Sequence, residues 1–145
     1  MRQTDRMEIT RQQEAIFLDK GNGTSVRYYI YPEYEIHHNE ILGHTVQQWH
    51  HHEVIEETLY IVSGQLQAFW AEDDIAYSEA LNPGDIIRVG KIPHTFANLA
   101  DEKVVFVVFR IVPDGTDKRQ TIKSDKVVDT PPSSWDEAAL LNQTA

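Results

Sequence analysis

The 145-residue chain contains no cysteine. Disulfides, thiol nucleophiles, iron–sulfur clusters and thiolate-bound zinc are therefore excluded, and any bound metal ion needs nitrogen and oxygen ligands. Long apolar runs are lacking too, since the longest, Val104 to Phe109, is far shorter than a membrane span. The N-terminal sequence MRQTDRMEIT has no apolar core typical of an export signal. We therefore expect a cytoplasmic protein.

Positive charge is scarce as well. The chain has 13 Lys and Arg against 23 Asp and Glu, which gives a formal net charge of -10 and a pI near 5.0. This is the wrong sign for binding a phosphate backbone or an anionic membrane, so we expect neither nucleic acid nor membrane as a partner. The expected partner is a small-molecule substrate, and a mass of 16.7 kDa suits one compact domain.

Residues 25–113 consist of short segments rich in β-branched and aromatic residues, with turn residues between them. The segments are VRYYIY, TVQQWHHH, TLYIVSG, QLQAFW, DIIRV and KVVFVVFRIV. No helical period of comparable strength occurs there, so the pattern predicts an all-β sandwich or barrel. The last segment does not alternate apolar with polar residues, which indicates that both its faces are covered, by a second sheet or by a partner subunit. On this ground we expect a homodimer.

The two ends of the chain are less informative. Residues 1–24 are expected to form a separate N-terminal segment, and residues 114–145 a polar arm with a short helix. Ser134 stands three residues before Glu137, which fits a capping box at the start of that helix. Packing of the helix on the barrel is the simpler interpretation, and an arm that crosses to another subunit is the alternative.

Histidines are the strongest chemical signal. All seven lie between His37 and His94, and three are consecutive, His50 to His52. In a strand His50 and His52 project from one face and His51 from the other, so two imidazoles can converge on one ion. Glu57 then begins one β segment, and His94 begins another, HTFAN.

These residues fall in a recognisable order. The first series is Gly43, His50, His52, Glu57 and Gly64; the second is Pro83-Gly84-Asp85, Pro93-His94 and Asn98. Together they resemble the two signature motifs of the cupin superfamily, in particular its small single-domain metal-binding members of quercetinase-like type. Two spacings depart from the family pattern: the Gly43–His50 gap is one residue longer and the Gly84–His94 gap one residue shorter.

The resemblance implies a jelly-roll β-barrel that holds one divalent metal ion through three imidazoles and one carboxylate. Carried over by position, the ligands are His50, His52, Glu57 and His94. Glu53 and Glu56 are rival carboxylates, but Glu57 lies seven residues before Gly64, as the motif requires. The ligand types suit Fe, Mn, Ni, Cu, Co or Zn and do not choose among them.

Strand alternation also predicts the lining of a pocket beside the metal. The residues expected to face inward are Val46, Gln48, Leu59, Ile61, Phe96 and Asn98, which describes an apolar cavity with few polar groups. Gln48 either orients a bound oxygen or is a hydrogen-bonded barrel residue. His37 and His38 are interpreted as surface residues, and His44 faces inward unless a bulge turns it out. Arg110 either forms an ion pair at a strand end or binds a substrate carboxylate.

Three functions fit this description. The first is a metal-dependent dioxygenase with Glu57 as catalytic base. The second is a non-redox metal-dependent isomerase, cyclase or lyase, and the third is a non-catalytic cupin that binds a small molecule. Retention of all four ligand positions favours the two enzymes over the binding protein.

Overall fold

The computed structural model describes residues 6–32 and 34–113. The arm and helix expected in residues 114–145, with Ser134 and Glu137, lie outside the described residues. Apart from a 3-10 turn, η1 (Gln12–Glu14), the described elements are strands. They are β1 (Ile16–Asp19), β2 (Thr24–Ile30), β3 (Tyr34–Ile41), β4 (Thr45–Val46), β5 (Glu56–Ser63), β6 (Leu66–Glu72), β7 (Ile75–Leu81), β8 (Ile86–Arg88), β9 (His94–Asn98) and β10 (Val104–Ile111).

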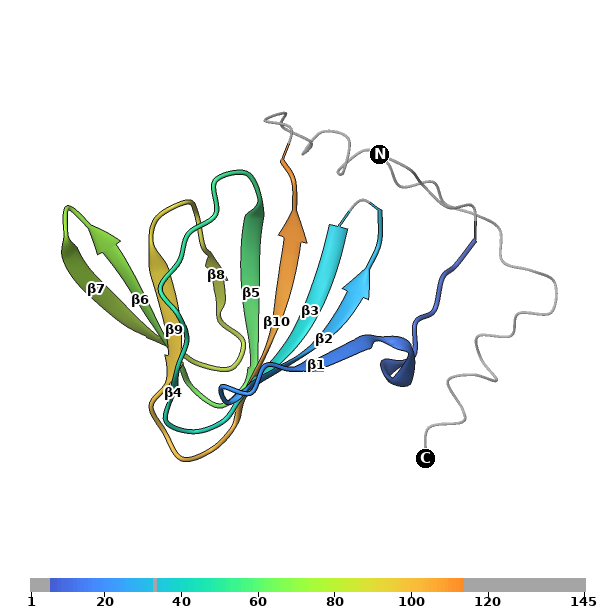
Figure 1. Ribbon diagram of the computed structural model, residues 1–145, viewed down its shortest axis with the longest axis horizontal. Helices are drawn as coiled ribbons and strands as arrows, with labels where there is room; N and C mark the ends of the chain where they lie inside the picture. Colours follow the sequence, from blue (N-terminus) through green and yellow to red (C-terminus); the bar gives the residue numbers. More distant parts are fainter. Residues whose placement is uncertain (1–5, 33, 114–145) are drawn as a thin grey trace, which may run out of the picture. The chain divides into compact units, whose positions relative to one another are not determined.

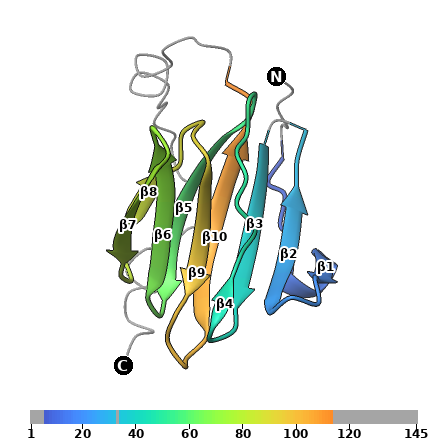
Figure 2. The same cartoon turned by 60° about the vertical axis from the view of Figure 1, so that its left-hand side comes forward.

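The strands form two antiparallel sheets. One has the order β1-β2-β3-β10-β5-β8 and the other the order β4-β9-β6-β7. Figures 1 and 2 show the four-stranded sheet facing the six-stranded one. Some neighbouring strands are consecutive in the chain, as β2 and β3 are, whereas others are distant, as when β10 lies between β3 and β5. The prediction of an all-β, jelly-roll type fold is confirmed.

The core lies between the sheets and accounts for the inward half of the apolar run in β10. Alternate residues of that strand are buried between the sheets, while the outward Phe109 is 42% exposed. The cluster consists of Ile41, Leu59, Ile61, Leu66, Ala68, Phe96, Val104, Phe106 and Val108. The second sheet thus covers one face of the run, and the outer face stays partly exposed among the described residues.

Several elements differ from the sequence-based expectation. The segment YEIHHNEI forms β3, although its two histidines were interpreted as surface residues. The predicted strand TVQQWHHH is reduced to β4, with a single bridge at His50. Strand β1 pairs with β2 through Leu18 and Val26, so the large sheet begins before the boundary expected at residue 25.

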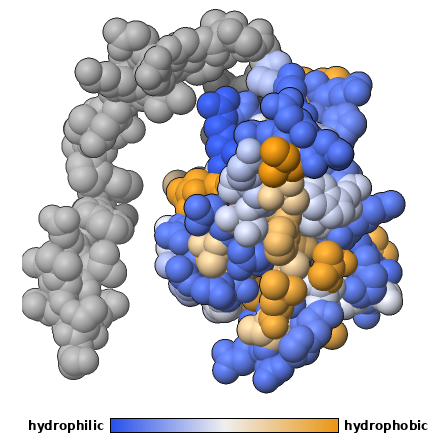
Figure 3. Space-filling model, turned by 90° about the vertical axis from the view of Figure 1, so that its left-hand side faces the viewer, coloured by the Kyte–Doolittle hydropathy of each residue, from blue (hydrophilic) through white to orange (hydrophobic). Residues whose placement is uncertain are grey.

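The surface seen from the side of β7 and β6 is mainly hydrophilic, with a narrow band of hydrophobic residues (Figure 3). Every residue of β7 before Leu81 is exposed, as expected for an edge strand. No helix among the described residues is long and apolar enough to cross a membrane.

Candidate metal centre

A bulge beside β9 decides which side chains face inward. Val46 pairs with Ala97, whereas His50 pairs with His94, so four residue steps on one side oppose three on the other. The extra residue reverses the alternation between the two pairs. Val46 is consequently 62% exposed, while the His50 ring lies against that of His94.

Three imidazole rings gather at this point. The His50 ring centroid lies 4.5 Å from that of His94 and 5.1 Å from that of His52. The rings of His52 and His94 are 6.2 Å apart. Reciprocal backbone hydrogen bonds of 2.9 and 3.0 Å join His50 and His94, so the loop that carries two of the rings is tied to the strand that carries the third.

The carboxylate nearest this cluster is that of Glu57 on β5. It is 6% exposed, and its Oε1 lies 3.4 Å from Nε2 of His52. The same oxygen accepts a hydrogen bond from Arg110, which stands opposite Glu57 in the pairing of β5 with β10. Arg110 is therefore the partner of an ion pair, one of the two roles expected for it.

The rival carboxylates have other partners. Arg88 donates a hydrogen bond to Glu56 and holds the pKa of that carboxyl below its usual value. The Glu53 side chain is 84% exposed and lies 3.4 Å from His51. Neither carboxylate contacts His50, His52 or His94 in the structure, so among the three rivals it is Glu57 that lies beside the cluster.

The nitrogen atoms of the cluster fit a metal ion. Nδ1 of His50 lies 2.9 Å from the Gln48 carbonyl oxygen, and Nδ1 of His94 lies 2.9 Å from that of Ile92. A carbonyl only accepts, so each Nδ1 donates its proton and each Nε2 keeps a lone pair, the usual second contact of a metal-binding histidine. Nε2 of His52 and of His94 is buried without a hydrogen-bond partner. Buried ring nitrogens without a hydrogen-bond partner are expected where an ion belongs.

Burial also favours the neutral, ligating form of two rings. Desolvation lowers the pKa of His94 and of His52 below the ordinary value of 6.5. Within residues 6–32 and 34–113, however, no three His, Asp or Glu side chains are already arranged around one point to hold an ion. The donor set thus fits a nitrogen and oxygen site, with the Glu57 carboxylate still shared with Arg110.

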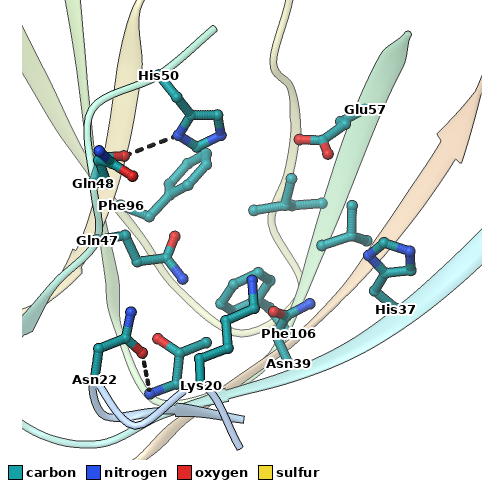
Figure 4. Close-up of a pocket in the computed structure, with 13 residues that line it drawn as sticks. Lys20, Asn22, His37, Asn39, Gln47, Gln48, His50, Glu57, Phe96 and Phe106 are labelled. Carbon is teal, nitrogen blue, oxygen red and sulfur yellow. Dashed lines mark hydrogen bonds between the residues drawn. The ribbon is translucent and has the colours of Figure 1, made fainter. Parts of the chain in front are cut away.

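A cavity of about 310 Å³ adjoins the cluster on the side of His50 and Glu57. Figure 4 shows the polar ends of Lys20, Asn39 and Gln47 directed into it. The full lining is Lys20, Asn22, Thr24, His37, Asn39, Gln47, Gln48, His50, Glu57, Leu59, Phe96, Phe106 and Val108. The expectation of an apolar cavity with few polar groups is wrong for this space, because β2, β3 and the hairpin before β2 supply a polar wall.

The six predicted pocket residues have different environments. Gln48, Leu59 and Phe96 line the cavity. Ile61 is fully buried in the core, and Val46 is turned outward by the bulge. Asn98 is fully buried and binds backbone groups: its Nδ2 donates to the carbonyls of Ile41 and Glu102, and its Oδ1 accepts from the Ala100 amide. Asn98 therefore joins chain segments and does not line the cavity.

A second cavity, of about 230 Å³, is bordered by His94. Apolar residues of β6 and β8, among them Trp70 and Ile87, contribute to its wall, and Phe96 borders both cavities. The larger cavity includes two of the four proposed ligands, His50 and Glu57, so it is the better candidate for a substrate.

The interpretation of His37 as a surface residue is wrong. His37 is buried on the inner face of β3, where Nε2 lies 2.9 Å from Oε1 of Glu35 and the ring makes an edge contact with Tyr28. His37, Asn39 and Ile41 alternate along the buried face of β3. Because the first two are polar, the sequence did not indicate that this face is buried. Of the other histidines, His44 is turned outward at φ 58° beside Asp101, and the half-exposed His51 lies near Glu53.

Burial of His37 predicts a pH-dependent stability. Desolvation lowers the pKa of the folded His37, so below the unfolded value of 6.5 the unfolded chain binds more protons than the folded one. Stability is therefore present above that pH and falls as the pH decreases. We expect the urea midpoint of metal-free protein to drop between about pH 7.5 and about pH 5.5, and to drop less in His37→Asn. An equal drop in both proteins would contradict this role.

The comparisons with known proteins agree on the fold. A family model described as a cupin domain matches residues 37–110. The solved structure of KdgF from Halomonas sp. has a TM-score of 0.59 at 19% identity, over 74% of this chain and 97% of that one. Hydroxypropylphosphonic acid epoxidase from S. wedmorenis has a TM-score of 0.59 at 17% identity, over 73% of this chain and 60% of that one.

The fold alone does not assign an activity. Drosophila melanogaster CENP-C bound to CAL1, with a TM-score of 0.64 at 16% identity over 70% of this chain and 84% of that one, has a similar structure. Nothing in these matches singles out a quercetinase-like subtype. A search of curated proteins found no match.

Proposed function

The chain belongs to the cupin domain family, and from this premise we propose that it is a metal-dependent enzyme of dioxygenase type that acts on a small organic molecule. One divalent ion, of Fe, Mn, Ni, Cu, Co or Zn, would be held by His50, His52, Glu57 and His94. The observation that carries the proposal is the gathering of three imidazoles beside a buried carboxylate, with Nε2 of His52 and of His94 lacking any other partner.

A redox-active ion bound there would supply Lewis acidity and electron transfer to oxygen. The protein residues have separate tasks. Glu57 would accept a proton from the substrate, with Arg110 holding its carboxylate in place. Leu59, Phe96 and Phe106 exclude water from one side of the cavity. The Gln47 main chain is fixed by its bonds to Phe96 and Thr95, which positions its amide toward the substrate.

A second candidate is a non-redox isomerase, cyclase or lyase. The specific observation in its favour is the polar wall of the cavity, where Asn39, Gln47 and Gln48 offer both donors and acceptors. Such a wall suits a hydroxylated carbonyl compound, whose developing negative charge a bound dication would stabilise without oxygen.

Oxygen consumption separates these reaction classes. We expect metal-loaded protein to take up oxygen with at least one member of a panel of flavonols, acyl ketones, β-diketones and hydroxylated carboxylates. Conversion of a substrate without oxygen uptake would favour the second candidate. Binding of a compound without its conversion, whether oxygen is present or absent, would indicate a non-catalytic cupin. It would contradict both enzyme proposals.

Glu57→Gln tests the proposed base. We expect turnover to fall at least about 100-fold, because proton transfer by a placed side chain typically contributes this much. Metal content should fall less, since three imidazoles remain. Metal content and turnover are measured on the same preparation. Glu56→Gln is the matched control, because Glu56 pairs with Arg88 and does not contact the imidazole cluster. Undiminished turnover in metal-loaded Glu57→Gln would contradict the base role.

Two further predictions remain proposals: a homodimer and a cytoplasmic location. The homodimer is supported by apolar side chains on the outer face of the large sheet, where Tyr60, Val62 and Phe109 are exposed. Faces of this kind are common at subunit contacts.

A further inference from the structure

We propose that the 310 Å³ cavity binds a small polyhydroxylated carboxylate, and that Lys20 is the residue that takes the carboxylate group. The inference rests on the proposed function, since it names the substrate class of the same site. It is carried by the charge, the hydrogen-bonding groups and the size of the cavity described above.

Lys20 brings an uncompensated positive charge to the cavity. In the part of the chain that the structure describes, its ammonium has no hydrogen-bond or ion-pair partner, whereas Lys103 lies 3.4 Å from Glu40. The one carboxylate in the lining, that of Glu57, is already paired with Arg110. In a protein with a net charge of -10, a free cation turned into a cavity favours an anionic ligand.

The side-chain amides of the lining indicate hydroxyl groups on that ligand. Asn39, Gln47 and Gln48 make no side-chain hydrogen bond within the described residues, although Asn39 is buried. Each amide offers two donors and an acceptor. A hydroxyl group both donates and accepts hydrogen bonds, so it can pair with either end of an amide. Asn39 is buried, Gln47 half-buried and Gln48 exposed, so an alcohol-bearing ligand would exchange the water on these amides for direct hydrogen bonds.

The hairpin that carries Lys20 is held in place. The Lys20 amide donates to the Thr24 carbonyl, and the Leu42 amide donates to the Gly23 carbonyl, each at 2.9 Å. Gly23 has φ 87°, and a Cβ there would lie 2.4 Å from Oγ1 of Thr45, so only glycine allows this approach. Lys20 is exposed, but its backbone is held in place, so little backbone entropy is lost when a ligand binds.

The volume limits the ligand to a small molecule. Ligand cavities typically measure about 300–1,000 Å³, and this one is at the lower end. Its apolar part, with Phe96 and Phe106, can contact the carbon face of a sugar acid while the amides contact the hydroxyl groups. A large planar aromatic substrate would leave those amides without partners.

The test measures binding of three probes by isothermal titration calorimetry. D-Glucuronate carries both a carboxylate and hydroxyl groups, D-glucose lacks the carboxylate, and benzoate lacks the hydroxyl groups. The proteins are the full chain, Lys20→Met, Lys20→Arg and, as a matched control outside the cavity, Lys91→Met. Each is studied metal-free and metal-loaded, and far-UV circular dichroism confirms that each variant is folded.

We expect D-glucuronate to bind the full chain more tightly than either other probe. Lys20→Met should weaken that binding at least about tenfold, and Lys20→Arg and Lys91→Met should retain most of it. Failure of D-glucuronate to bind, or equal binding by Lys20→Met, would overturn the inference. Loss of metal binding with Lys20-dependent binding intact would instead contradict the proposed function alone.

Discussion

Replacing His52 or His94 with alanine is expected to lower affinity for a divalent metal at least about 100-fold, because loss even of a residue that only supports a ligand costs about 10–100-fold. Nε2 of each ring is buried without a hydrogen-bond partner, and that of His52 lies 3.4 Å from the Glu57 carboxylate, so both nitrogens are available to an ion. Neither substitution removes a side-chain bond between strands, and the variants should remain folded. Equilibrium dialysis against Co²⁺, with metal analysis of the protein, measures the loss directly.

His51→Ala is the matched control, since it removes the ring between the two proposed ligands. His51 is half-exposed and lies near Glu53, outside the cluster. Its variant should bind Co²⁺ with the affinity of the full chain. Equal losses of Co²⁺ affinity in all three variants would show that the histidine run acts as a nonspecific chelator. They would contradict the prediction that His51 projects from the opposite face to His52.

Asn98→Ala is expected to lower the free energy of unfolding by about 2–4 kcal/mol, because it leaves buried backbone groups without partners. The amide of Asn98 joins the end of β3 at Ile41 to the turn after β9 at Glu102. Water cannot replace these bonds, since Asn98 is fully buried. Urea denaturation of metal-free protein is the measurement.

An exposed asparagine provides the control. Asn82 accepts a side-chain hydrogen bond from Gln65 at the surface, so Asn82→Ala should change stability by less than about 0.5 kcal/mol. If Asn98→Ala kept full stability but lost ligand binding, Asn98 would be a pocket residue, as strand alternation alone suggested.

The strand residues and the proposed ligands could be recognised from the sequence because each left a local pattern. The apolar run of β10 indicated a strand covered on both faces. Its inner residues Val104, Phe106 and Val108 are core, whereas Phe109 on the outer face is 42% exposed. Spacing identified Glu57 ahead of Glu53 and Glu56, and the structure places Glu57 beside the imidazoles. Spacing alone could not show that Arg110 shares that carboxylate, since the pair depends on the register of β5 with β10.

The polar wall of the cavity could not be predicted from local patterns. Lys20 reaches the site because a hairpin folds back on Thr45 and Leu42, a contact between segments far apart in the sequence. The bulge opposite β9 adds one residue, which turns Val46 outward and brings Gln47 into the lining. Alternation counts residues in a regular strand, so a single insertion reverses it.

The proposal that one divalent ion is bound by His50, His52, Glu57 and His94 is tested most directly by metal analysis of untagged protein. The protein is purified without chelating resin, and metal-free samples are then offered Fe²⁺, Mn²⁺, Co²⁺, Ni²⁺, Cu²⁺ and Zn²⁺ in turn. We expect one tightly held ion per chain with at least one of these metals, and its loss in His94→Ala. A folded protein that retains none of them would show that these four residues do not form a metal site.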